Sequence, residues 1–202
     1  MNTPGQGDAS TRPGKTGALI LVVGPSGAGK DSVIDFARDR LADHPGVMFV
    51  RRVVTRDAQA GAEDHASLDP AAFEQAKAEG AFAFTWQAHG LSYGLPRAMD
   101  DHIAKGGVAI ANGSRATLTA LRTLYPSLVV VLVTVSRETL AKRLAARGRE
   151  TAQEIEARLE RAELYCDVGD HIAISNDGPL DEAGGKLVEV VDGAMAAFVP
   201  AS

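Results

Sequence analysis

Apolar residues along this chain form short strand-like runs that alternate with segments of helical periodicity. The run ALILVV from Ala18 ends in a glycine cluster and leads into DSVIDFARDRLAD, where Val33, Phe36, Ala37 and Leu41 recur at helical spacing. This pattern predicts a strand, a glycine-rich loop and a helix, in that order.

The same alternation continues to the end of the sequence. LVVVLVTV is apolar on both faces, which is typical of an interior parallel strand covered by helices. Further strands are predicted at VMFVRRVVTR, AFAFTWQAHG, VAIAN and HIAISN. A short helix is predicted with Asp69 as its N-cap, Pro70 at its first position and Gly80 after its end. Further helices are predicted at about 97–105, 115–125 and 137–148, from Thr151, and over 180–197. Strands that alternate with helices favour a mostly parallel, three-layer α/β fold.

Local signals add detail to three segments. Phe82, Phe84 and Trp86 alternate, so we expect them on one side of a half-buried strand, with Trp86 as a core residue. The following GLSYGLP is rich in turn-forming residues and predicts a turn segment. Thr151 and Glu154 match a capping box that starts a helix.

Composition narrows the class of protein. The chain has 202 residues, 45% apolar and 23% charged, which fits one globular domain over 17–202. A formal charge of -5 argues against nucleic-acid or membrane-surface binding. Cys166 is the single cysteine, and no apolar run is long enough to span a membrane, so a cytoplasmic location is expected. Residues 1–16 are polar and rich in Gly and Pro, and are predicted to be a disordered tail.

The stretch GPSGAGK matches the GxxxxGK pattern and lies between a predicted buried strand and a helix. In that position backbone N–H groups can surround phosphate oxygens, and a lysine can reach the β- and γ-phosphates of ATP. The alternative is a glycine-rich turn with a solvated lysine. The residues expected to bind the nucleotide are Gly24, Pro25, Ser26, Gly27, Ala28, Gly29, Lys30, Asp31 and Ser32.

The residue after Lys30 departs from the usual pattern. A Ser or Thr hydroxyl normally ligates Mg²⁺ there, whereas this chain has Asp31, with a hydroxyl at Ser32. No Asp follows the strands VAIAN or LVVVLVTV. A carboxylate beside a triphosphate is repelled unless a divalent cation lies between them, so Asp31 is expected to hold Mg²⁺, directly or through water. The alternative is that Asp31 caps the helix.

Several arginines gather near Gly148. Arg143 and Arg147 are four residues apart on one helical face, Arg149 follows the glycine, and Arg158 lies on the next helix. Guanidinium groups on a mobile arm can neutralise the charge that develops in phosphoryl transfer. The alternative is a solvated helix pair with ion pairs to nearby glutamates.

GPSGAGK, the VVTR segment, FTWQAHGLSYG, RLAARGRE and SND together resemble the guanylate-kinase-like branch of the nucleoside monophosphate kinases from Gly17 onward. The resemblance implies a P-loop NTPase fold, an acceptor-binding subdomain at about 51–97 and an arginine lid at about 137–158. It implies three groups of site residues: Arg56 and Tyr93 on the acceptor's phosphate, Arg143, Arg147 and Arg158 around the transferred phosphoryl, and Asn176 and Asp177 near the adenine.

Three positions depart from guanylate kinase where the guanine nucleotide would be bound. The family's base-reading Glu is Thr85 here, a phosphate-binding Tyr is His65, and the acidic strand end is Asn112. A site that lacks the Glu partner should discriminate poorly for guanine, so GMP is not the expected acceptor.

GPSGAGKDS, EDH, WQAHGLSYG and NGSR resemble more closely the ribose 1,5-bisphosphate phosphokinases of bacterial phosphonate breakdown, which make phosphoribosyl diphosphate from ATP. A sugar bisphosphate needs cations for a second phosphate rather than a base pocket. The candidates are Arg52, Arg56, His65 and Arg115, although His65 could be an ordinary loop histidine and Arg115 a helix N-terminal residue. The full set expected on the acceptor is Arg52, Thr55, Arg56, His65, Thr85, Tyr93, Asn112 and Arg115.

The resulting hypothesis is a monomeric or homodimeric kinase that uses ATP and Mg²⁺ and transfers the phosphoryl group in line, without a covalent enzyme intermediate. Its partner is a small phosphorylated molecule, and Cys166 is expected to be a packing residue. Two alternatives stay open: a guanylate kinase or other nucleoside monophosphate kinase, and an inactive guanylate-kinase-like module that binds a phosphopeptide. The intact GPSGAGK and the arginines weigh against the inactive module.

Overall fold

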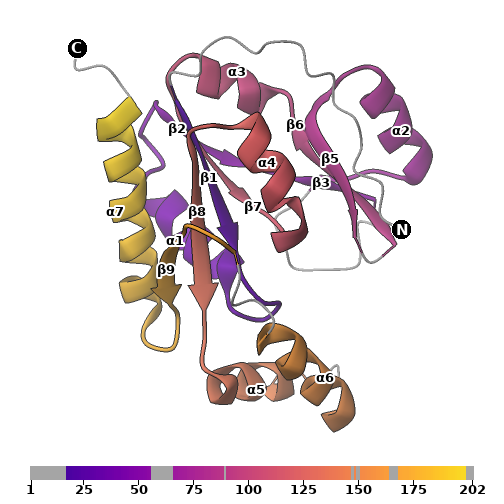
Figure 1. The fold of residues 1–202 in the computed structure, drawn as a ribbon, viewed down its shortest axis with the longest axis vertical. Helices are drawn as coiled ribbons and strands as arrows, with labels where there is room; N and C mark the ends of the chain where they lie inside the picture. The colour runs from indigo at the N-terminus through magenta and orange to yellow at the C-terminus, as the bar shows by residue number, and fades with distance from the viewer. Residues whose placement is uncertain are drawn as a thin grey trace.

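A computed structural model describes residues 17–55, 66–88, 90–146, 148, 151–163 and 168–198. The predicted tail 1–16 and the predicted site residues Arg56, His65 and Arg147 lie outside this range, as do Arg149 and Cys166. Figure 1 shows a central sheet with helices on both faces and a smaller sheet beside it. Among the described residues, no helix is long and apolar enough to cross a membrane.

The central sheet has five parallel strands in the order β2-β7-β1-β8-β9. All six residues of β1 have no exposed surface, because helices cover both faces of the sheet. Burial on both faces explains why ALILVV is a continuous apolar run rather than an alternating one. The strands are β1 (Ala18–Val23), β2 (Val47–Val50), β7 (Val108–Asn112), β8 (Leu128–Thr134) and β9 (Ile172–Ser175).

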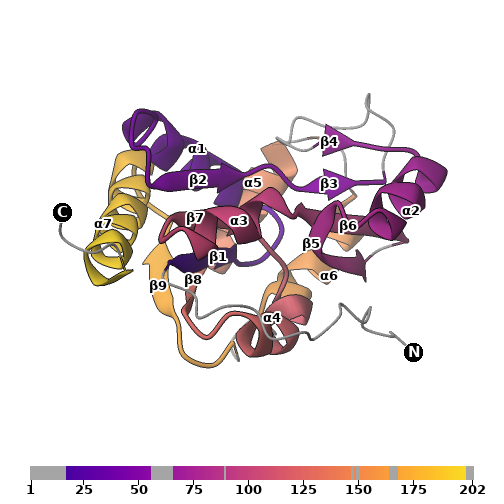
Figure 2. The same cartoon turned by 90° about the horizontal axis from the view of Figure 1, so that it is seen from above.

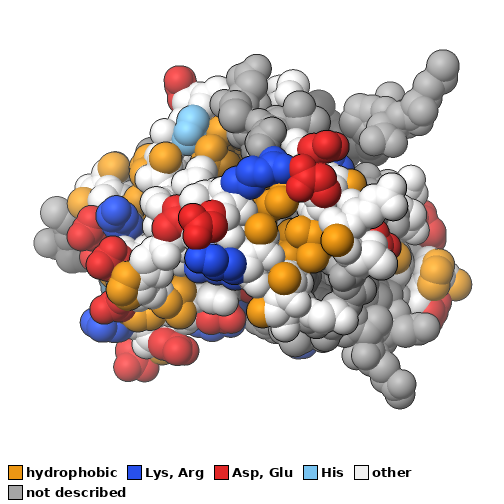
Figure 3. All heavy atoms as spheres, turned by 90° about the horizontal axis from the view of Figure 1, so that it is seen from below, with side chains coloured by type: hydrophobic (Ala, Val, Ile, Leu, Met, Phe, Trp, Pro, Cys, Tyr) orange, Lys and Arg blue, Asp and Glu red, His pale blue; other side chains and the backbone are white. Residues whose placement is uncertain are grey.

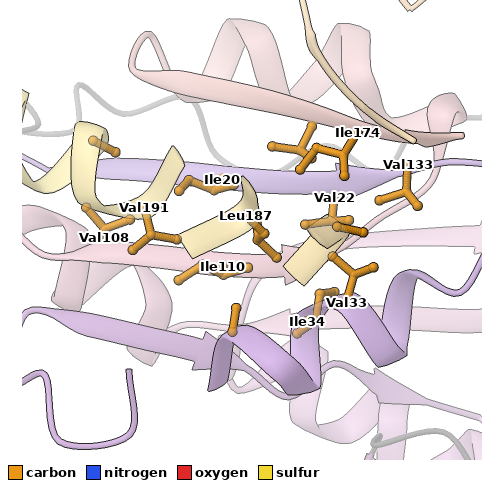
Figure 4. Packing of buried hydrophobic residues seen from close by; sticks show 14 of the residues in the cluster. Ile20, Val22, Val33, Ile34, Val108, Ile110, Val133, Ile174, Leu187 and Val191 are labelled. Carbon is orange, nitrogen blue, oxygen red and sulfur yellow. The ribbon is translucent and has the colours of Figure 1, made fainter. Parts of the chain in front are cut away.

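Two pairs of helices form the outer layers. On one face, α1 and α7 pack over Ile20 and Val22 of β1 through Val33 and Leu187 (Figure 4). On the other face, α3 and α4 cover the alternate residues of β1. The predicted three-layer α/β fold is therefore confirmed. The helices are α1 (Lys30–Arg40), α3 (Ala98–Ala104), α4 (Leu118–Leu124) with the short η1 (Arg115–Thr117) before it, and α7 (Leu180–Phe198).

The second sheet has four strands in the order β4-β3-β6-β5 and lies with α2 to one side of the central sheet (Figure 2). The segment VMFVRRVVTR does not form the single strand that was predicted. It forms β2 and β3, which belong to the two different sheets, and Arg51 and Arg52 connect them. The elements are β3 (Val53–Val54), β4 (Ala66–Ser67), β5 (Phe82–Ala88), β6 (Leu91–Pro96) and α2 (Pro70–Ala78).

The prediction of a turn segment at GLSYGLP is wrong, because Leu91–Pro96 form β6, antiparallel to β5. A Cβ at Gly94 would lie 2.6 Å from the Phe82 ring, so this glycine makes room for an aromatic side chain of the partner strand. Gly94 therefore serves packing within a strand, whereas its residue type alone suggested a turn.

The expectation that Phe82, Phe84 and Trp86 share one side of β5 is wrong for Phe82. The register with β6 shifts between Phe82 and Phe84, which is a β-bulge. Phe82 stacks on Phe73 of α2 at a centroid distance of 4.7 Å, whereas Trp86 stacks on Tyr93 of β6 at 5.1 Å. Phe84 and Trp86 pack against the core beneath α3 and α4, so the core role of Trp86 is confirmed.

Two helices, α2 and α6, begin at the capping residues that the sequence predicted. Asp69 Oδ1 accepts a hydrogen bond from Ala72 N at 2.9 Å, which caps α2. Thr151 and Glu154 form the predicted capping box: Thr151 N donates to Glu154 Oε2 at 2.7 Å and Glu154 N donates to Thr151 Oγ1 at 3.3 Å. This box starts α6 (Ala152–Glu163), which pairs with α5 (Arg137–Ala146) at one end of the molecule (Figure 1).

Asp177, in the loop after β9, holds the N-terminus of α5. Its carboxylate accepts hydrogen bonds from Ser136 N at 2.9 Å and from Ser136 Oγ at 2.8 Å. Hydrogen bonding by the Thr139 hydroxyl and by Ser136 lowers the pKa of Asp177 from 3.8 to about 2. The loop after β9 is thereby joined to the first turn of α5.

Asp177→Asn should lower the free energy of unfolding at pH 7, because it weakens the cap of α5. The loss should be only about 1 kcal/mol, because solvent screens an exposed carboxylate. The pKa of Asp177 is lower in the folded protein than the unfolded value of 3.8, so its stabilisation is present above that pH and is lost as the pH falls toward about 2. Urea unfolding at pH 7 and near the lowered pKa measures the change. Asp192→Asn, at an exposed position of α7, is the control. A difference that stays constant on acidification would contradict this assignment.

Two adjacent glycines of α7 should respond in opposite directions to Ala. A Cβ at Gly184 would lie 2.3 Å from Phe36 Cδ1 and 2.8 Å from Phe36 Cβ on α1, whereas a Cβ at Gly185 meets nothing within 4 Å. Gly185→Ala should stabilise by about 0.5–1 kcal/mol through helix propensity. Gly184→Ala should destabilise, because overpacking costs about 1–3 kcal/mol. Chemical denaturation measures both, and equal stabilisation would refute the close α1–α7 contact.

Candidate active site

The GPSGAGK segment forms a tight loop between β1 and α1. Gly27 and Gly29 have φ angles of 95° and 86°, which favour glycine. A Cβ at Gly29 would also lie 2.4 Å from Asn176 Nδ2, so the position has no room for a side chain. Gly29, the N-cap residue of α1, has no side chain to accept from the first-turn N–H groups, which suits these groups to bind another acceptor. This arrangement is the one that binds phosphate oxygens at helix N-termini.

Lys30 lies at the start of α1 and folds back over this loop. Its Nζ donates to Gly24 O and to Pro25 O, both at 3.0 Å, and the side chain is partly buried. The ammonium group is thus held at the loop instead of extending into solvent. Its contact with ATP phosphates stays a prediction.

Arg143 of α5 and Asn176 after β9 both contact the backbone of the loop. Arg143 donates to Asn176 O at 2.7 Å and to Ala28 O at 3.3 Å. Asn176 is 3% exposed, and its Nδ2 donates to Ala28 O at 2.7 Å. The structure therefore places the Asn176 amide against the loop, while Asp177 binds the N-terminus of α5. Their predicted position near the adenine is not tested.

Asp31 and Asn112 meet although they are far apart in the sequence. Asn112 ends β7, and the parallel register of β7 with β1 brings it beside the first turn of α1. Asn112 Nδ2 donates to Asp31 Oδ1 at 2.5 Å. Within the described part of the chain, Asp31 has no cationic partner. Asn112 was expected on the acceptor, and its contact with Asp31 was missed.

The chemistry of Asp31 fits Mg²⁺. Mg²⁺ commonly binds one or two carboxylates, keeps several waters and takes its other ligands from substrate phosphates. Asp31 offers one carboxylate beside a phosphate-binding loop. No group of three or more His, Cys, Asp or Glu residues gathers elsewhere in the described ranges to form an all-protein cage.

Two of the predicted acceptor residues, Arg52 and Tyr93, lie beside each other, and the ring of Trp86 lies next to Tyr93. The Arg52 guanidinium lies 5.8 Å from the centroid of the Tyr93 ring, and Tyr93 stacks on Trp86. Thr55 Oγ1 accepts from Ser92 N at 2.8 Å, so this hydroxyl is used to join β3 to β6. Arg52 is positioned here by the Tyr93 ring.

Thr85 and Tyr93 lie on opposite faces of the β5–β6 hairpin. Tyr93 pairs with Trp86 and Thr85 pairs with Gly94, and successive side chains of a strand point to opposite faces. The structure therefore does not bring these two predicted acceptor residues together. Arg115 begins η1, three residues after Asn112, at the carboxyl end of β7.

The α5–α6 pair packs around Leu140, Leu144 and Leu159. Arg137 pairs with Glu156, and Figure 3, seen from this end of the molecule, shows basic and acidic side chains interspersed. Hydrogen bonds from the Thr151 backbone and side chain lower the pKa of Glu154, and the charge of Arg158 adds to the effect. These interactions agree with the alternative of a solvated α5–α6 pair held by ion pairs. Arg143 differs, because it contacts the loop between β1 and α1.

Comparison with known proteins gives several relatives under one name, ribose 1,5-bisphosphate phosphokinase PhnN. The protein of Brucella melitensis biotype 2 is 52% identical over 165 residues, which cover 81% of this chain and 86% of the relative. That of Chelativorans sp. (strain BNC1) is 45% identical over 186 residues, covering 91% and 89%. That of Pseudomonas fluorescens (strain SBW25) is 47% identical over 182 residues, covering 87% and 95%.

Solved structures resemble the fold at low identity. Guanylate kinase from Anaplasma phagocytophilum superposes with a TM-score of 0.61 at 17% identity, covering 90% of this chain and 87% of that one. A sugar kinase from Janibacter sp. HTCC2649 gives 0.51 at 18% identity, covering 91% and 99%. No family model matches the sequence. The structural likeness supports a guanylate-kinase-like P-loop fold, and the sequence identity to the relatives shows that this chain belongs to the ribose 1,5-bisphosphate phosphokinase family.

Proposed function

We propose that this protein transfers the γ-phosphate of ATP to ribose 1,5-bisphosphate and forms 5-phosphoribosyl 1-diphosphate, as a step in phosphonate degradation. The observation that carries the proposal is the 52% identity to the Brucella ribose 1,5-bisphosphate phosphokinase over 81% of the chain. The loop between β1 and α1 supplies the matching phosphate-binding geometry.

On the donor side, the loop and Lys30 bind the triphosphate of ATP. Lys30 Nζ exchanges the carbonyls of Gly24 and Pro25 for β- and γ-phosphate oxygens, because hydrogen bonds to an anionic oxygen are stronger. Asp31 holds Mg²⁺, directly or through water. When bound, this ion neutralises charge between the phosphates and the carboxylate.

The transfer is an in-line displacement. An oxygen of the acceptor's 1-phosphate forms a bond to the γ-phosphorus while the bond to the β-phosphate oxygen breaks, so ADP leaves. The attacking oxygen is already anionic, so no general base is required. Lys30 and Arg143 stabilise the charge that develops, together with Arg147 and Arg158 of the lid at 137–158.

On the acceptor side, the subdomain at about 51–97 binds the sugar bisphosphate. Arg52 binds its second phosphate. The centroid of the Tyr93 ring lies 5.8 Å from the Arg52 guanidinium and already restricts this side chain, so Arg52 loses fewer conformations on binding. Arg56, His65 and Arg115 are the further cations of this proposal. Thr85 is set aside because its strand position faces away from Tyr93.

Two further expectations concern the cellular location and the oligomeric state of the protein. A cytoplasmic location follows from the single cysteine, and the oligomeric state is monomer or homodimer. Both stay predictions.

The acceptor can be tested directly by phosphorus NMR. Protein, Mg²⁺ and ATP are incubated with ribose 1,5-bisphosphate in one sample and with GMP in another. We expect diphosphate resonances of the sugar product in the first sample and little GDP in the second. Rapid GDP formation without the sugar product would restore the guanylate kinase alternative, and ATP binding without any turnover would favour the inactive module.

Lys30→Met should lower kcat by about 10²–10³-fold, because one donor to developing charge contributes about 3–4 kcal/mol to transition-state stabilisation. Lys186→Met, at an exposed position of α7, is the matched control and should retain full activity. Steady-state kinetics of both variants, with circular dichroism to verify folding, measure the effect. Near-normal kcat in Lys30→Met would remove the loop lysine from the mechanism.

A further inference from the structure

The contact between Asn112 and Asp31 uses one polar atom of each side chain. Asn112 Nδ2 donates to Asp31 Oδ1 at 2.5 Å. The nitrogen must face the carboxylate, since the reversed amide would place two acceptors against each other. The amide is neutral, so it orients Asp31 without neutralising its charge.

The other polar atom of the Asn112 side chain is buried. Among the described residues, Asn112 Oδ1 has no hydrogen-bond partner. A buried acceptor without a donor destabilises a protein by about 1–3 kcal/mol, so an apolar side chain of similar shape would serve stability better. The presence of an amide here therefore calls for a role other than stability.

The contacts of Asn112 favour a role toward Asp31 over contact with the sugar acceptor. The nitrogen donates to Asp31 and the oxygen is enclosed, so only the second N–H of the amide remains for another acceptor. The second oxygen of Asp31, Oδ2, has no partner in the part of the chain that the structure describes. One carboxylate oxygen is thus fixed by Asn112 while the other remains for a ligand.

We infer that Asn112 is a positioning residue that holds the Asp31 carboxylate toward the Mg²⁺ of bound ATP, and that it does not bind the acceptor. The inference rests on the metal role given to Asp31 in the proposed function. It explains why the carboxylate and the amide occur together. A carboxylate at Asn112, 2.5 Å from Asp31, would repel it, whereas an amide donor stabilises it.

A double-mutant cycle tests this with binding measurements alone. The variants are Asn112→Leu, Asp31→Asn and the double variant, and calorimetry measures ATP affinity with Mg²⁺ and with EDTA. Asn112→Leu should weaken Mg²⁺-ATP binding by about 10-fold or more, as seen for residues that orient metal ligands, and leave ATP binding in EDTA unchanged. In the Asp31→Asn background it should have no further effect. An equal loss in both backgrounds, or no loss at all, would overturn the inference.

Acceptor binding supplies the contrasting measurement. The affinity of wild type and Asn112→Leu for ribose 1,5-bisphosphate without nucleotide should be the same, and a large loss in the variant would return Asn112 to the acceptor site. If neither protein binds this sugar but the ATP cycle behaves as expected, the acceptor assignment fails while the positioning role stands.

A second variant keeps the test valid if Asn112→Leu does not fold. Asn112→Asp places two carboxylates together, so its thermal unfolding midpoint in EDTA should fall below that of wild type. Mg²⁺ with ATP should then raise the midpoint more in this variant than in wild type, because the cation separates the two charges. An equal or smaller rise would count against a cation at Asp31.

Discussion

The parallel register of β1 with β7 and β8 is the constraint on which the rest of the structure depends. Val22 pairs with Asn112 on one side and with Val131 on the other, so the carboxyl ends of these strands meet at one edge. Ligands of open α/β sheets bind at this edge. The register brings the glycine-rich loop after β1, Asn112 at the end of β7 and, through β8, Asn176 after β9 to the same edge of the sheet. The complete burial of β1 fixes this arrangement.

Much of this arrangement could be predicted from the sequence because its signals are local. The run ALILVV, the glycines of GPSGAGK, and the Thr151–Glu154 capping box each specify an element within a few residues. The three-layer order follows from the alternation of strands and helices. The glycine-rich loop between β1 and α1 was predicted in the same way, since its pattern and its position between a strand and a helix agree.

The small sheet could not be predicted equally well because it depends on pairing between distant residues. Gly94 suggested a turn until its contact with Phe82 showed that it makes room for a ring. The bulge after Phe82 changes the face of that ring, which a strict two-residue period does not anticipate. At the site, the sequence did contain one usable signal for the missed contact. A carboxylate appears at Asp31 where a hydroxyl is usual, and an amide at Asn112 where an acid is usual.

Arg143 has a consequence for how α5 is joined to the loop between β1 and α1. Its two terminal nitrogens donate to the backbone carbonyls of Ala28 and Asn176. A guanidinium carries five N–H donors, so these two bonds leave others that can bind an anion. Arg143 therefore links α5 to the loop and to the segment after β9 at once, and any anion that it binds is coupled to both.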